Sequence, residues 1–150
     1  MQILDFKVAA KSFFTSKEVI SALDKATRKV LIKFGAFVMT TARQSIRKHG
    51  KDAQGNEKTS PPGHAPYSHT GVLKRGILFG YDILWHSVVI GPTLAPNRRM
   101  ARTPPRLEYG ASKIGESWGN RPAYLRRPYM KPALDKNLPV LPAMWHNSIK

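Results

Sequence analysis

The chain has 150 residues, 41% of them hydrophobic, no cysteine and a formal net charge of +16. This length predicts a single domain spanning residues 1–150, and the lack of cysteine excludes disulfides and cysteine-ligated metals. The sequence has no apolar run of membrane-spanning length and no signal peptide in residues 1–11, so we expect a soluble protein made in the cytoplasm. The charge suits nucleic acid, an acidic protein or a membrane surface as partner, or simply a well-solvated basic surface.

Residues 1–15 alternate only partly between apolar and polar, and we expect them to form an N-terminal arm. A long helix is predicted over residues 16–48, because Thr15 and Glu18 have the spacing of a capping box and an apolar stripe follows at helical intervals. Such a helix would be about 50 Å long, which suggests that part of it is reserved for a neighbouring copy. We expect its C-terminal third, residues 38–48, to meet that neighbour. The side chains expected to face its own sheet are Leu23, Val30, Phe34 and Phe37.

The segment that follows the helix, residues 50–69, contains only small, polar, proline and glycine residues. Loops of this length are uncommon in compact domains unless they are functional or ordered by a partner, so we interpret it as an assembly loop. Two apolar, β-branched and aromatic runs at 72–81 and 83–90 then predict an antiparallel hairpin.

A second loop is expected over residues 93–106, followed by a short strand at 107–110 and another loop at 111–120. A short helix is expected to begin near Pro128 or Pro132, because proline suits the first helical turn. Residues 139–150 are expected to be an extended C-terminal arm. The predicted fold is therefore α+β, with one long N-terminal helix and one short C-terminal helix packed on a small antiparallel sheet, and with long assembly loops.

No spacing in the chain matches a catalytic or phosphate-binding motif, and the nine acidic residues are not paired on one predicted element. His64 and His69 lie five residues apart in the first loop, but no further ligand is evident near them, so no metal site is predicted. We therefore expect a protein that is not an enzyme and has no catalytic residues and no cofactor.

Both loops contain basic side chains, which could neutralise phosphates, pair with acidic groups of a neighbouring subunit or stay solvated. Aromatic residues at 109, 118, 124 and 129 could stack on exposed bases, although packing in the core or an interface is the more common role. The candidate DNA-channel or inter-subunit residues are Lys51, Lys58, Arg98, Arg99, Arg102 and Arg106.

Three short segments, taken in order, resemble a family of siphophage tail components. The first is the run from Pro61 to Ile77, which contains Pro-Pro-Gly and then Thr-Gly-Val-Leu with a basic pair. The second is Leu-Glu-Tyr-Gly at 107–110, and the third is Arg-Pro-Tyr-Met-Lys-Pro-Ala-Leu at 127–134. With the long helix in front of them, the resemblance covers residues 16–138. The motif residues are Pro62, Gly63, Thr70, Gly71, Leu73, Lys74, Arg75, Glu108, Tyr109, Gly110, Arg127, Pro128 and Pro132.

This resemblance implies a structural virion protein of the head–tail junction, which is a neck, tail-completion or tail-terminator protein. It would be assembled in the host cytoplasm as a ring, expected to be a hexamer, around the DNA channel. Its partners would be copies of itself, the tail-tube protein and the head-closure or connector proteins, with non-specific contact to genomic DNA and no membrane. Within the motifs, Gly71 would allow a tight turn or a close backbone approach that leads into a strand, and Glu108 would pair with an arginine of its own or of an adjacent subunit. The alternative is a general nucleic-acid-binding protein of ribosomal type.

Overall fold

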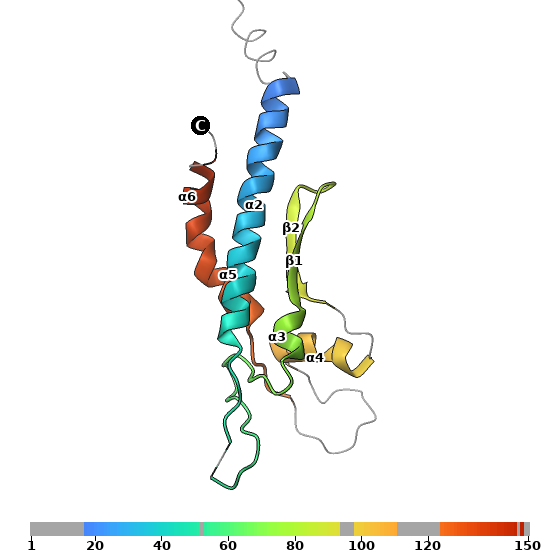
Figure 1. Cartoon of the computed structure of the whole chain (residues 1–150), viewed down its shortest axis with the longest axis vertical. Helices are drawn as coiled ribbons and strands as arrows, with labels where there is room; N and C mark the ends of the chain where they lie inside the picture. Colours follow the sequence, from blue (N-terminus) through green and yellow to red (C-terminus); the bar gives the residue numbers. More distant parts are fainter. Residues whose placement is uncertain (1–16, 52, 94–97, 111–123, 147, 149–150) are drawn as a thin grey trace, which may run out of the picture.

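The computed structural model describes residues 17–51, 53–93, 98–110, 124–146 and 148, and only the backbone of residues 98–102. Its layout is α+β, as predicted: a long N-terminal helix, short helices near the C-terminus and a two-stranded antiparallel sheet (Figure 1). Among these described residues, no helix combines the length and the apolar character needed to cross a membrane. The elements are α2 (Lys17–Ser45), α3 (Val72–Gly76), β1 (Ile77–Asp82), β2 (Ser87–Pro92), α4 (Arg98–Tyr109), α5 (Met130–Asn137), the 3-10 helix η1 (Leu138–Val140) and α6 (Leu141–His146).

Helix α2 is the central element, with the hairpin on one side and α5 and α6 on the other (Figure 1). The strands β1 and β2 pair in register from Ile77 opposite Pro92 to Asp82 opposite Ser87. Both strands and both C-terminal helices contact α2. The long helix is therefore shared by two layers that lie on opposite sides of it.

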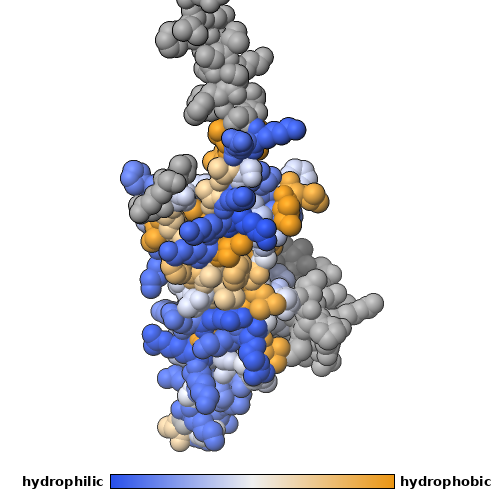
Figure 2. All heavy atoms as spheres, turned by 45° about the horizontal axis from the view of Figure 1, so that its top comes forward, coloured by the Kyte–Doolittle hydropathy of each residue, from blue (hydrophilic) through white to orange (hydrophobic). Residues whose placement is uncertain are grey.

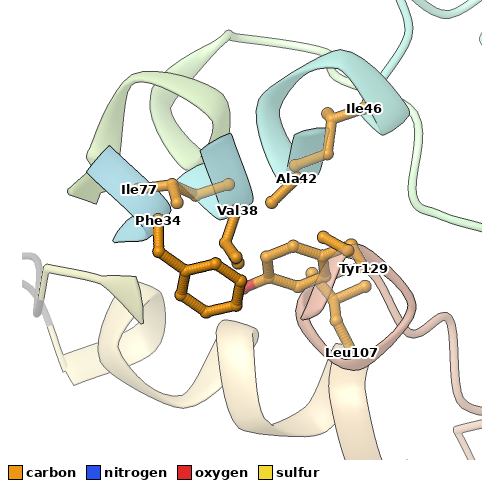
Figure 3. Close-up of a cluster of buried hydrophobic side chains, with 8 residues drawn as sticks. Phe34, Val38, Ala42, Ile46, Ile77, Leu107 and Tyr129 are labelled. Carbon is orange, nitrogen blue, oxygen red and sulfur yellow. The ribbon is translucent and has the colours of Figure 1, made fainter. Parts of the chain in front are cut away.

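The hydrophobic core is built on the C-terminal half of α2 and the residue that follows it, where four buried side chains succeed one another at intervals of four residues. Around this stripe pack the first residue of β1, the end of α4 and the start of α5 (Figure 3). All of these elements meet at one end of the hairpin. The buried cluster comprises Phe34, Val38, Ala42, Ile46, Ile77, Leu107, Tyr129 and Ala133.

Close approach of the hairpin to α2 depends on Gly35, which is buried. A Cβ atom at this position would lie 2.7 Å from Cγ2 of Val88 and 2.9 Å from Cδ2 of Phe79. Both distances are shorter than ordinary van der Waals contact. The missing side chain therefore lets the hairpin pack directly against the helix.

Val30 and Phe34 are buried as predicted, but the predicted division of α2 between its own sheet and a neighbour is otherwise wrong. Val38, Ala42 and Ile46, which were assigned to a neighbouring copy, are buried in the core of the same chain. Leu23 and Phe37, which were assigned to the sheet, are exposed. The physical reason is that β1, α4 and α5 converge on the C-terminal half of the helix. These elements of the same chain bury that half.

Two predicted segments of the central region have different structures. Residues 72–76 form α3 instead of the start of a strand, and the strands are limited to 77–82 and 87–92. Residues 98–109 form α4, so the loop predicted at 93–106 and the strand predicted at 107–110 are both wrong there. Gly110 adopts a left-handed φ of 81° and its N–H donates to the carbonyl of Arg106 at 2.9 Å, which is a typical glycine helix end.

The C-terminal region confirms a helix beginning near Pro128, since α5 starts at Met130. The extended arm predicted from residue 139 is wrong for residues 139–146, which continue as η1 and α6. Pro139 and Pro142 are each the second residue of a new helical segment, where a backbone N–H has no partner within the helix. These prolines redirect the helical path without ending it.

Candidate functional site

The three motif segments, far apart in sequence, are joined by hydrogen bonds. The N–H of Gly63 donates to the carbonyl of Arg126 at 2.9 Å, and Nε of Arg127 donates to the carbonyl of Ser60 at 2.8 Å. The N–H of Arg127 donates to the carbonyl of Leu107 at 2.6 Å. We call residues 60–63, 107–110 and 126–131 the motif node. Its first role is structural, because it ties the loop, α4 and α5 together.

Glu108 completes the node by capping α5. Its Oε2 accepts hydrogen bonds from the N–H groups of Tyr129 at 3.0 Å and Met130 at 3.1 Å, and its Oε1 accepts from Lys131 at 2.8 Å. The first N–H groups of a helix have no partners inside it, and an anion stabilises them. Within the described part of the chain, Glu108 therefore binds backbone N–H groups of α5 in place of the arginine expected from its own subunit, and pairing with an arginine of an adjacent subunit stays a prediction. Burial, with a contribution from Glu108, raises the pKa of the Tyr129 hydroxyl.

The Thr70–Gly71 pair makes the tight turn that the resemblance implied, but the turn leads into α3 and not into a strand. Gly71 has a φ of 75°, in the left-handed region that favours glycine. The N–H of Arg75 donates to the carbonyl of Gly71 at 3.0 Å, and its Nη2 donates to the carbonyl of Thr70 at 3.3 Å. Leu73 packs against the core, whereas Lys74 and Arg75 are exposed on α3.

The remaining motif residues lie at or near the surface. Pro62, Tyr109 and Pro132 are exposed, and Pro128 is half-buried. A Cβ on Gly110 would lie 2.9 Å from the carbonyl oxygen of Tyr124, so this glycine permits close packing of two backbone segments. Most of the motif pattern is therefore explained by the requirements of the fold.

The candidate basic residues do not come together in one described patch. Lys51 and Lys58 are exposed in the loop that extends beyond the end of α2, whereas the four arginines belong to α4 (Figure 1). Arg106 is half-buried, and the side chains of Arg98, Arg99 and Arg102 lie outside the described part of the structure. Positions 98, 102 and 106 follow at intervals of four along a helix, which replaces the flexible basic loop expected from the sequence.

The hairpin ends in three consecutive exposed apolar residues, which we call the apolar tip: Ile83, Leu84 and Trp85. Their exposed fractions are 66%, 87% and 80%. The turn is ordered by Asp82, whose Oδ1 accepts hydrogen bonds from the N–H groups of Leu84 at 2.9 Å and Trp85 at 3.2 Å. A local hydrogen-bonded turn thus presents large apolar side chains to solvent.

Polar contacts anchor the apolar tip to the N-terminal half of α2. The guanidinium of Arg28 lies 5.7 Å from the centre of the Tyr81 ring. The Tyr81 hydroxyl lies 3.3 Å from Nδ1 of His86, which in turn lies 3.9 Å from Oδ1 of Asp24.

Hydrophobic residues stand among hydrophilic ones over the upper part of the molecule, whereas its lower end is mostly hydrophilic (Figure 2). The tip was not predicted from the sequence, although three consecutive apolar residues next to the Tyr81–Asp82 turn are a usable signal.

A cavity of about 500 Å³ lies between the loop, α3, β2 and α4. Its walls are largely apolar and include Pro66, Tyr67, Leu73, Pro92, Leu107 and Tyr124. The hydroxyl of Ser60, which lines it, is buried and has no hydrogen-bond partner among the described residues. Ser60, Leu107 and Arg127 of the motif node border this cavity, as do the motif residues Thr70 and Gly71, so the node frames a pocket as well as holding the fold.

Two histidines and a glutamate come together at the base of the loop. Nε2 of His49 lies 3.5 Å from Oε1 of Glu57, and Nδ1 of His69 lies 2.7 Å from Oε2 of the same carboxylate. His64, the partner considered for His69 from sequence, instead faces the carbonyl of Pro62 at 3.3 Å. Sequence spacing missed the cluster because its members are separated by irregular backbone.

Comparison with family models, with curated proteins and with solved structures finds no match to this chain. What the chain does must therefore be inferred from its own geometry and from the motif resemblance.

Proposed function

We propose that this chain is a structural subunit of a phage head–tail junction, which forms a ring around the DNA channel and joins the tail tube to the head connector. The observation that supports this most directly is the apolar tip at Ile83–Trp85. Three large apolar side chains on an ordered turn are typical of a protein–protein contact. Copies of the same chain, the tail-tube protein and the connector proteins are the proposed partners.

The composition of the tip favours a protein interface over a nucleic-acid interface. Exposing apolar surface is unfavourable by about 25 cal/mol per Å². Covering Leu84 and Trp85 with a partner therefore contributes favourably to the free energy of binding. Tryptophan is enriched among the residues that dominate binding energy. Because Asp82 already orders the turn, little conformational entropy remains to be lost on binding.

A head-to-tail ring needs two different surfaces on each subunit. The tip provides one of them, at the free end of the hairpin. The cavity bordered by Leu73, Pro92 and Leu107 lies at the other end, about 20 Å away for strands of six residues. Two such surfaces on one chain suit a closed ring better than a symmetric dimer.

The charge of +16 fits a ring that surrounds DNA. Subunits of the same strong charge repel one another, and a polyanion in the channel or an acidic neighbour would relieve that repulsion. Phosphate contacts by lysine and arginine need no sequence specificity, as is appropriate for a channel through which any DNA passes.

The test is the oligomeric state of the full-length chain, measured by analytical ultracentrifugation and negative-stain electron microscopy over a range of concentrations. We expect rings for the natural chain and monomers for the double variant Leu84→Ser with Trp85→Ser. The matched control is Val89→Ser, which changes an exposed apolar residue on the body of the same hairpin and should leave rings intact. A natural chain that stays monomeric at all concentrations contradicts the proposal.

The second candidate is a general nucleic-acid-binding protein, favoured by the charge and by the four arginines of α4. It predicts tight, saturable binding to duplex DNA or RNA at physiological salt. It also predicts loss of that binding when Arg98, Arg99, Arg102 and Arg106 are replaced by alanine. Weak, strongly salt-dependent binding together with ring formation favours the ring subunit.

A further inference from the structure

We propose that His49, Glu57 and His69 form a binding site for a divalent transition-metal ion of the zinc type. One ligand atom from each residue lies within 4.8 Å of the others. The two imidazole rings are stacked, with centroids 4.7 Å apart and planes inclined by 24°. Two imidazoles and one carboxylate are a common ligand set for zinc, and solvent can supply the remaining position.

The backbone brings these residues together independently of any ion. Lys48 and Ser68 form a parallel bridge, in which the N–H of Ser68 donates to the carbonyl of Arg47 at 2.8 Å. This bridge places His49 beside His69. A second, antiparallel bridge between Lys51 and Glu57 returns the chain toward His49, with the N–H of Lys58 donating to the carbonyl of Gly50 at 2.9 Å.

The hydrogen bond of His49 fixes which of its nitrogens is available. Its Nδ1 lies 3.2 Å from the carbonyl oxygen of Ser68, and a carbonyl can only accept, so Nδ1 carries the proton. In the neutral ring Nε2 then presents a lone pair, and it faces Glu57 Oε1 at 3.5 Å. A histidine whose other nitrogen donates to a backbone carbonyl is the usual arrangement around a bound metal.

Two acceptors that face each other repel unless a cation lies between them. A proton can fill this position, and so can a metal ion. Ligand atoms of a tetrahedral zinc site, with bonds of about 2.0–2.1 Å, are about 3.4 Å apart. The distance of 3.5 Å between His49 and Glu57 already matches this spacing, whereas the 2.7 Å contact between His69 and Glu57 must open slightly.

The cluster is accessible, since the side chains of His49, His69 and Glu57 are 22%, 38% and 60% exposed. A bound ion would join the two ends of the loop that leaves α2 and returns to α3. The ion would also stabilise the antiparallel bridge between Lys51 and Glu57, which lies inside that loop. All three ligands come from one chain, so the site stands whether or not the chain forms rings.

The experiment titrates metal-free, full-length protein with Zn²⁺ by isothermal calorimetry and with Co²⁺ by visible absorption. We expect one equivalent of Zn²⁺ and a Co²⁺ spectrum that indicates nitrogen ligation. We expect His49→Ala, His69→Ala and Glu57→Gln each to weaken binding by at least about tenfold. His64→Ala is the matched control, because it removes a histidine of the same loop that lies outside the cluster.

Hydrogen exchange provides a second measurement. Zn²⁺ should slow exchange in residues 48–69 of the natural chain and of His64→Ala, with no such effect in His49→Ala. Glu57→Gln changes an exposed side chain and keeps its size, so its folding should be preserved even if a histidine variant is less stable. Absence of Zn²⁺ binding by the natural chain overturns the site. The site is also overturned if Glu57→Gln and the double variant His49→Ala with His69→Ala both bind Zn²⁺ as tightly as the natural chain does.

Discussion

The two halves of α2 have opposite environments although they share one amphipathic pattern. In the C-terminal half, Phe34, Val38, Ala42 and Ile46 are buried against the rest of the chain. In the N-terminal half, apolar side chains such as Leu23, which is 52% exposed, face solvent. The pattern of apolar residues along a helix therefore shows which face is apolar, but it does not show which element or molecule covers each turn of that face.

The difference has a topological cause. The start of β1, the end of α4 and the start of α5 all meet the C-terminal half of α2, while among the described elements the hairpin and α6 extend alongside its earlier turns (Figure 1). Polar contacts such as that between Asp24 and His86 dominate where the hairpin tip passes α2. Among the described residues, the N-terminal half is consequently the more exposed part of the helix, which is the reverse of the division expected from the sequence.

The largest effect should come from placing a charge in the buried half. We expect Phe34→Asp to unfold the chain, because it creates a cavity and buries a carboxylate without a partner, at a cost of at least about 4 kcal/mol. Circular dichroism and urea denaturation measure this. Leu23→Asp is the matched change in the exposed half and should leave the fold intact while impairing ring formation. If both variants unfold, the two halves of α2 do not differ in burial as described.

A smaller loss should follow from filling the space at Gly35. Gly35→Leu drives a side chain into Val88 and Phe79, and we expect the free energy of unfolding to fall by about 2–3 kcal/mol despite the better helix propensity of leucine. Urea denaturation gives the value. Ala22→Leu, on an exposed turn of the same helix, should leave stability almost unchanged. A stabilised Gly35→Leu variant would mean that the hairpin does not pack on α2 as described.

Arg43 and Arg47 test the assignment within the C-terminal half itself. Nε and Nη2 of Arg43 donate to the carbonyl of Ile77 at 3.0 and 2.7 Å, so Arg43→Ala should destabilise the fold by about 1–2 kcal/mol. Arg47 is exposed, and Arg47→Ala should change stability by less than about 0.5 kcal/mol. Equal denaturation midpoints for the two variants would mean that the Arg43 side chain does not stabilise the contact between α2 and β1.

The smallest effect is expected at Thr41, where α2 meets α5. Its Oγ1 accepts a hydrogen bond from Nδ2 of Asn137 at 2.9 Å, while the same nitrogen also donates to the carbonyl of Ala133 at 2.7 Å. Thr41→Val should therefore cost only about 0.5–1 kcal/mol. Thr40→Val, one residue earlier and exposed, is the control for the change in helix propensity. Identical thermal midpoints would indicate that this link contributes nothing.

Local signals predicted the elements whose causes are local. The period of α2, the hairpin and the start of α5 near Pro128 follow from side-chain pattern and proline chemistry, and the structure confirms them. The structure also confirms a left-handed turn at Gly71. The start of the long helix at Ser16 and the N-terminal arm lie outside the described residues.

Features that depend on contacts distant in sequence could not be predicted in the same way. Helix α4 contains Pro104 and Pro105, which argue for a loop, yet Leu107 packs in the core and Glu108 caps α5. The cluster of His49, Glu57 and His69 likewise depends on backbone bridges that no spacing rule encodes. Tertiary contacts outweighed local propensity at both places.

The hydrogen bonds of the motif node should make the stability of the fold nearly independent of the length of the segment between Gly110 and Tyr124. The bond from the N–H of Arg127 to the carbonyl of Leu107, together with the cap by Glu108, closes the chain on both sides of residues 111–123. The sequence predicts a loop at 111–120, and lengthening a flexible loop that is closed at its base costs only about 0.6 kcal/mol for each doubling of its length. A peptide tag inserted between Gly110 and Tyr124 should therefore be tolerated, and it would mark the position of the subunit in an assembled particle.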